Sequence, residues 1–171
     1  MAPGRYAEFL PAFLDWRRQM LAGHAGEKRS GASFNFPRLP DYFSEQTLNS
    51  ASVVITRNLP RPPLSSWGLS EFASFETQAM AGITFHDTYF VQPDVADDES
   101  IHCHELVHLI QWEVLGPKDF LLLYASGLQE HGYLNSPVEV MAYEHQRRFD
   151  AHRPPYSVDA EVRRQTLALL E

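Results

Sequence analysis

The segment from Ile101 to Leu115, which reads IHCHELVHLIQWEVL, constrains the fold of this chain more than any other. The acids and the serine at 97–100 are typical of a helix start, because their side chains cap backbone amides and favour the positive end of the helix dipole. Gly116 followed by Pro117 is typical of a helix end. The spacing of apolar residues between these signals predicts a helix over 101–115.

This helix is expected to be buried, because apolar side chains occupy most of its circumference. At 100° per residue, one side gathers Ile101, His104, His108, Gln111, Trp112 and Leu115, with Glu105 at its rim. A neighbouring apolar stripe holds Cys103, Val107, Ile110 and Val114. The side left for solvent holds His102, Leu109 and Glu113. We therefore interpret His102 as a surface or second-layer residue.

His104, Glu105 and His108 form the pattern His-Glu-x-x-His within this helix. Residues four apart lie one turn above each other on one face, so the two imidazoles can bind the same ion. Zinc accepts neutral imidazole nitrogen, and Glu105 beside it can act as general base toward a metal-bound water. The alternative is a pair of core histidines with ordinary hydrogen bonds. Burial of three polar groups on one helix favours the metal, because unpaired polar groups are costly to bury.

Composition and charge exclude several other classes of protein. With 44% hydrophobic and 12% aromatic residues the chain is predicted to be globular, and its 171 residues suffice for one domain with a core. A net charge of −8 argues against nucleic-acid binding, which needs a basic patch. Cys103 is the only cysteine, and we find neither a secretory signal nor an apolar run of membrane-spanning length. We expect a cytoplasmic protein that binds neither nucleic acid nor membrane.

The whole chain, 1–171, is predicted to form a single domain. We expect an N-terminal helix and irregular segment at 1–50, a sheet and the central helix at 51–115, and a helical part at 116–171. Helices are predicted at 5–22 (with Pro11 as a kink or the true start near Leu10), 69–81, 118–129, 137–152 and 158–170. Strands are predicted at 52–56 and 82–91, the second interrupted by a hairpin or bulge at His86 and Asp87, while 23–50 is predicted to be irregular.

A catalytic zinc site usually has three protein ligands, so the sequence must supply one more. The metzincin extension, with glycine at 111 and histidine at 114, is excluded by Gln111 and Val114. Glu139 is the preferred ligand, because it lies in the first turn of the helix predicted to begin near Pro137. Ala142 shares its face and would allow a close approach to the central helix.

Glu139 has a competing local interpretation. It matches a capping box with Ser136, in which the carboxylate would reach back to the Ser136 amide. If Glu139 serves that purpose, Glu144 and His145 are the substitute ligands. Tyr143 lies on the same face as Glu139 and could direct its hydroxyl into the same cleft.

A resemblance to gluzincin-type zinc metallopeptidases rests on two motifs, His104-Glu105-x-x-His108 and Glu139-Val140-Met141-Ala142-Tyr143. Residues 52–112 also resemble small predicted bacterial metallopeptidase domains, in which a strand, a helix and a glycine-led strand precede the histidine helix. The resemblance covers a third to a half of the chain, and the Asn-Glu-x-x-Ser-Asp signature of thermolysin-like enzymes is absent. It implies an α+β zincin-like fold, with a mixed sheet packed on the active-site helix and zinc on His104, His108 and Glu139.

The same resemblance implies hydrolysis of a peptide or protein substrate. Glu105 would be the catalytic base and Tyr143 a second catalytic residue that stabilises the oxyanion, for which Tyr133 and His131 are also candidates. The strand at 82–91 would be the sheet edge on which an extended peptide lies. The alternative is a non-catalytic zinc-binding protein of the same fold that binds a partner, with its zinc closed by a fourth ligand such as His131 or His145.

Overall fold

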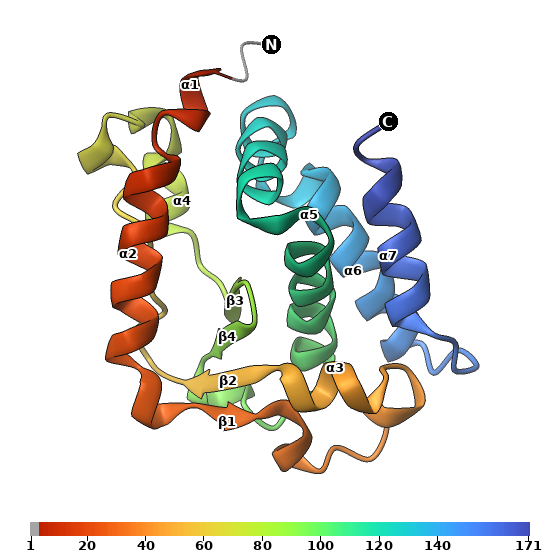
Figure 1. The fold of residues 1–171 in the computed structure, drawn as a ribbon. Coiled ribbons are helices and arrows are strands. Elements are labelled where there is room, and N and C mark those ends of the chain that lie inside the picture. The colour runs from red at the N-terminus through yellow and green to blue at the C-terminus, as the bar shows by residue number, and fades with distance from the viewer. Residues whose placement is uncertain (1–3) are drawn as a thin grey trace.

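The computed structural model describes residues 4–171 and shows an α+β fold (Figure 1). The helices are α1 (Gly4–Ala7), α2 (Leu10–Gly23), α3 (Glu45–Ser50), α4 (Ala73–Thr77), α5 (Glu99–His131), α6 (Pro137–Asp150) and α7 (Val158–Ala168). The strands are β1 (Arg29–Ser30), β2 (Ser52–Ile55), β3 (Gly82–Phe85) and β4 (Thr88–Val91). The predicted α+β class is confirmed. Within residues 4–171, none of the helices combines the length and the apolarity needed to cross a lipid bilayer.

The strands of this described part form a four-stranded mixed sheet in the order β1-β2-β4-β3. Strands β2 and β4 are parallel, and the two outer pairs are antiparallel. Val53, Val54 and Phe90 are fully buried, as expected for β-branched and aromatic residues in central strands. The predicted interruption at 86–87 is a hairpin, in which His86 takes the left-handed conformation (φ 61°) typical of such tight turns. In the strand order of the sheet β3 comes last, so it is an edge strand.

Helix α5 is broken at Gly116, whose backbone (φ 69°, ψ 171°) is not helical. Asp98 caps the start of the helix by accepting a hydrogen bond from the Ser100 amide, and Pro117 opens the second half. The predicted stop at Gly116 is therefore a break, after which the chain continues as helix to His131. Figure 1 shows the two halves of α5 offset from each other, with the second half lying across from α2.

The first half of α5 is the central packing element. Cys103, Leu106 and Ile110 are completely buried in one cluster with residues of β2, β4, α6 and α7. On its other side Trp112 packs in a second cluster and donates a hydrogen bond from its indole nitrogen to the carbonyl of Thr84 in β3 (3.1 Å). The part of α5 that carries the His-Glu-x-x-His pattern thus packs between the sheet and the C-terminal helices.

Two of the three residues predicted to face solvent on this helix are buried, so that prediction is wrong. His102 is completely buried and Leu109 is 4% exposed. The His102 ring packs against Phe34 and Phe36, at centroid distances of 5.0 and 4.6 Å, and both ring nitrogens are hydrogen-bonded. The cause is that residues 31–43, predicted to be irregular, fold over this side of α5.

Several predicted boundaries are confirmed and others need correction. Helix α2 begins at Leu10, the predicted true start, and its Phe13 is buried. The segment 23–50 is not wholly irregular, because it contains β1 and α3, and Ser44 caps α3 by accepting from the Thr47 amide. The helix predicted at 69–81 is reduced to α4 and a preceding 3-10 turn. The helices predicted at 137–152 and 158–170 are α6 and α7.

Candidate metal centre

The centre is built from the first half of α5 and the first turn of α6. His104 and His108 lie one helical turn apart, and their Nε2 atoms are 3.1 Å from each other. Glu139 extends from α6 so that its Oε2 lies 3.5 Å from the Nε2 of each histidine. All three side chains are buried, with 6%, 6% and 2% exposure. Among residues 4–171, these three are the one group of His, Cys, Asp or Glu side chains that could hold a metal ion.

The donor geometry fits a tetrahedral metal ion. Ligand atoms about 2.0–2.1 Å from a tetrahedral zinc lie roughly 3.3 Å from each other, and the three donor–donor distances here are 3.1, 3.5 and 3.5 Å. The Oε2 atom of Glu139 is buried and has no hydrogen-bond partner. Its near neighbours are the two imidazole nitrogens at 3.5 Å, so a cation held between the three donors would satisfy this oxygen.

Two glutamines fix the orientation of the imidazoles. Gln111 accepts from His108 Nδ1 (2.8 Å) and donates its amide to the Val138 carbonyl, while Gln146 accepts from His104 Nδ1 (3.0 Å). With both Nδ1 atoms hydrogen-bonded to glutamine oxygens, the two Nε2 atoms face Glu139, where a metal ion can take the place of their protons. The sequence analysis missed both contacts. Gln146 lies seven residues, or about two helical turns, after Glu139. The helical face that the two residues share could therefore have indicated that both side chains point toward the histidines.

Glu139 is held by a tyrosine rather than by its own helix start. The Tyr124 hydroxyl, from the second half of α5, donates to Glu139 Oε1 at 2.9 Å. The capping box with Ser136 is absent: no side-chain cap bond forms at this helix start, and Ser136 Oγ has no partner. That alternative for Glu139 is therefore wrong, and its carboxylate is free to face the histidines.

The substitute ligands lie elsewhere. Glu144 is exposed on the far side of α6 from the group. His145 is buried but is hydrogen-bonded to the Tyr156 hydroxyl (2.5 Å) and to Gln165 (2.9 Å). His131 is exposed and lies 3.6 Å from Glu130. In the described residues no fourth protein ligand joins the three.

Glu105 lies beside the three donors but is not one of them. It is 3% exposed, and its Oε2 accepts a hydrogen bond from the Thr84 hydroxyl of β3 at 2.7 Å. Burial raises the pKa of Glu105, and the two neighbouring histidines act against that shift. A carboxylate with a raised pKa binds a proton more readily than a free glutamate does, as a general base must.

Burial and mutual attraction also set the protonation of the donors. Burial lowers the pKa of His108, but the Glu139 carboxylate more than offsets this and raises it to about 9. Burial likewise acts to raise the pKa of Glu139, yet His108 and His104 hold it far below its usual range. The centre therefore contains a carboxylate that is always ionised, the form that binds a cation.

Two tyrosines complete the polar wall of the centre. The Tyr143 ring packs edge-on against His104 at a centroid distance of 4.6 Å, and its hydroxyl is hydrogen-bonded to that of Tyr133. Burial, and then the nearby Glu139 charge, raises the pKa of both tyrosines. Both hydroxyls stay protonated and can donate a hydrogen bond. The structure thus brings Tyr143 and Tyr133 to the centre and leaves His131 outside it.

Gly82 in β3 lies against the Glu105 side chain. A Cβ added at Gly82 would lie 2.5 Å from Glu105 Oε1 and 2.9 Å from the carbonyl oxygen of Phe90. We expect Gly82→Ala to destabilise the protein by about 1–3 kcal/mol, because a strand carbonyl cannot give way as a flexible side chain can. Thermal unfolding measures this, with Gly26→Ala as the control since nothing lies within 4 Å of its added Cβ. An unchanged melting temperature in Gly82→Ala would contradict this close approach.

No protein family, curated protein or solved structure matches this chain. The function proposed below therefore rests on the side chains and distances of the centre itself, together with the two motifs identified in the sequence.

Proposed function

We propose that this protein is a zinc-dependent metallopeptidase with a zincin-like fold. The observation that carries the proposal is the buried Glu139 Oε2, which lacks a hydrogen-bond partner and lies 3.5 Å from the Nε2 atoms of both His104 and His108. Three protein donors are the number typical of catalytic zinc, which keeps one position for substrate or water. All three donors and Glu105 also line a cavity, so the centre is accessible to a ligand.

The residues around the centre have distinct roles in the proposed reaction. When bound, zinc polarises a peptide carbonyl and lowers the pKa of a water molecule. Glu105, held in place by Thr84, takes a proton from that water and transfers it to the leaving amine. In this proposal the protonated hydroxyls of Tyr133, which lines the cavity, and Tyr143, which packs on His104, would donate hydrogen bonds to the developing negative charge.

The position of β3 supports a peptide as the substrate. It is an edge strand of the sheet in the described part of the chain, and all four of its residues, Gly82 to Phe85, line the same cavity as the metal donors. An edge strand offers backbone N–H and C=O groups to which an extended peptide can add as a further strand, although the Thr84 carbonyl of β3 already accepts from the Trp112 indole. A peptide bound in this way would pass Glu105, which contacts β3 through Thr84.

The test is digestion of a diverse peptide library by the zinc-loaded protein, with products identified by mass spectrometry. We expect cleavage that stops when zinc is removed by a chelator and returns when zinc is restored. A protein that binds zinc at this centre but cleaves nothing in the library would contradict the peptidase proposal. That outcome would favour a zinc-binding module that recognises a partner.

A further inference from the structure

The cavity at the metal centre extends far beyond it and is almost entirely apolar. The space inside it is about 120 Å³, roughly the size of an apolar cavity that holds one aromatic ring. Its walls come from α2, the segment 62–80, β3 and the second half of α5. Among the described residues that line it, the charged or titratable His, Asp, Glu, Lys and Arg side chains are the four at the inner end, His104, Glu105, His108 and Glu139.

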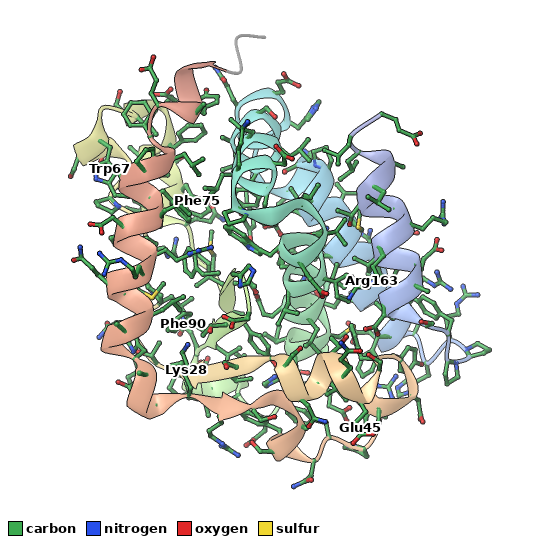
Figure 2. All side chains as sticks on the ribbon, in the orientation of Figure 1. Lys28, Glu45, Trp67, Phe75, Phe90 and Arg163 are labelled. Carbon is green, nitrogen blue, oxygen red and sulfur yellow. The ribbon has the colours of Figure 1, made fainter. Side chains whose placement is uncertain are left out.

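Aromatic rings form one continuous wall of this cavity. Trp112 stacks on Phe120 at a centroid distance of 4.0 Å and an angle of 18°, and Phe120 lies nearly parallel to Tyr124 at 5.7 Å and 12°. Phe75, from the segment 62–80, meets Tyr124 edge-on at 5.8 Å, and Figure 2 labels it in the space between α2 and α5. Phe13 of α2 also stacks on Trp112, at a centroid distance of 6.3 Å.

Tyr124 connects this wall to the metal centre. Its ring is part of the aromatic stack, while its hydroxyl donates to Glu139 Oε1. A group that lies against the ring is therefore adjacent to the ligand carboxylate. A charged group is disfavoured in the cavity because the apolar walls offer it no partner, and the two carboxylates at the inner end further disfavour a negative group.

We propose that the protein selects peptides with a bulky apolar side chain, aromatic or branched aliphatic, beside the bond that is cleaved. This inference rests on the proposed function and names its substrate class. The side chain occupies the cavity between α2 and the second half of α5 and stacks on the wall of Trp112, Phe120 and Tyr124. The residues that select the peptide side chain are therefore different from the three metal donors.

The experiment measures binding separately from hydrolysis. Zinc-loaded Glu105→Gln protein is titrated with the peptides acetyl-Ala-X-Ala-amide, where X is Phe, Leu, Trp, Ala, Asp or Lys, and binding is followed by tryptophan fluorescence, since Trp67 and Trp112 line the cavity. We expect the Phe and Leu peptides to bind roughly 10- to 100-fold more tightly than the Ala peptide, from the area of side chain buried. We expect the Asp and Lys peptides to bind no better than the Ala peptide.

Two variants test whether the cavity causes this preference. Ala125→Phe adds a ring inside the cavity and should reduce the Phe-to-Ala ratio to within about threefold, because the space for the side chain is filled. Leu122→Phe is the matched control, on the same helix but outside the cavity lining, and should keep the ratio. Phe75→Ala enlarges the cavity and should shift the preference from Phe toward Trp. Circular dichroism spectra identical to wild type establish that each variant is folded.

The outcomes separate the two proposals. Equal binding of the Phe, Leu and Ala peptides, or a preference that Ala125→Phe and Phe75→Ala leave unchanged, would overturn the inference even if the wild type cleaves peptides. The same preference in protein that cleaves none of these peptides would support the cavity assignment while the peptidase proposal fails. Tighter binding of dodecanoyl-alanine amide than of every peptide would overturn the inference in favour of an acyl chain as the occupant.

Discussion

Glu139→Ala protein is expected to lose its zinc. Purified wild type should carry one zinc per chain by elemental analysis, on the three donors of the centre. Removal of Glu139 takes away the one charged ligand and leaves two imidazoles with only Glu105, which is not a ligand, as a nearby negative charge. The loss of affinity should exceed the roughly 10- to 100-fold that follows loss of an outer-shell partner.

The control for this variant is Glu144→Ala, which removes an exposed glutamate from the same helix and should keep a full complement of zinc. Circular dichroism and thermal unfolding of both variants check that the fold is intact. Full zinc occupancy in Glu139→Ala would show that the histidine pair is completed by another group. Wild type that takes up no zinc after reloading would contradict the metallopeptidase proposal itself.

Glu105→Gln should lower the rate of peptide hydrolysis by about 10²- to 10⁴-fold while the zinc content stays at one per chain. The amide has the shape of the carboxylate and can still accept the hydrogen bond of the Thr84 hydroxyl, but it cannot take a proton from water. The measurement is kcat/KM on a peptide identified from the library, together with elemental analysis of the same sample.

Glu113→Gln is the matched control for this second variant. Glu113 is an exposed glutamate on the first half of α5 that pairs with Arg163 at 2.8 Å, so its neutralisation should leave the rate unchanged. Activity that survives in Glu105→Gln would identify another base or a contaminating peptidase. Loss of zinc in Glu105→Gln would instead give this residue a part in holding the ion.

The parts of the fold that the sequence predicted are those governed by local signals. The helix from Glu99, the break at Gly116 and the hairpin at His86 follow from capping acids, from a glycine-proline pair and from alternation along a strand. Glu139 was selected for the same kind of reason, since a first-turn position is rigid. In the structure the Glu139 carboxylate, on α6, lies next to the two histidines of α5.

What the sequence left unpredicted depends on contacts between distant or unpatterned segments. His102 looks exposed on a helical projection, and it is buried only because Phe34 and Phe36 arrive from a segment without periodicity. The bond from Tyr124 to Glu139 crosses a helix break and a turn, so no fixed spacing indicates it. The cavity draws on α2 and 62–80 together, and neither segment carries a recognisable motif.

The break at Gly116 separates the metal-site residues of helix α5 from most of its cavity-lining residues. This separation affects how such a protein can evolve. The histidines and Glu105 lie before it, whereas Tyr124 and the rest of the α5 contribution to the cavity wall lie mostly after it. Apart from Tyr124, which holds Glu139, residues after the break or in α2 and 62–80 can be substituted to reshape the cavity without displacing a metal donor. Duplicated copies of this chain could therefore diverge in what they recognise while the reactive centre is inherited unchanged.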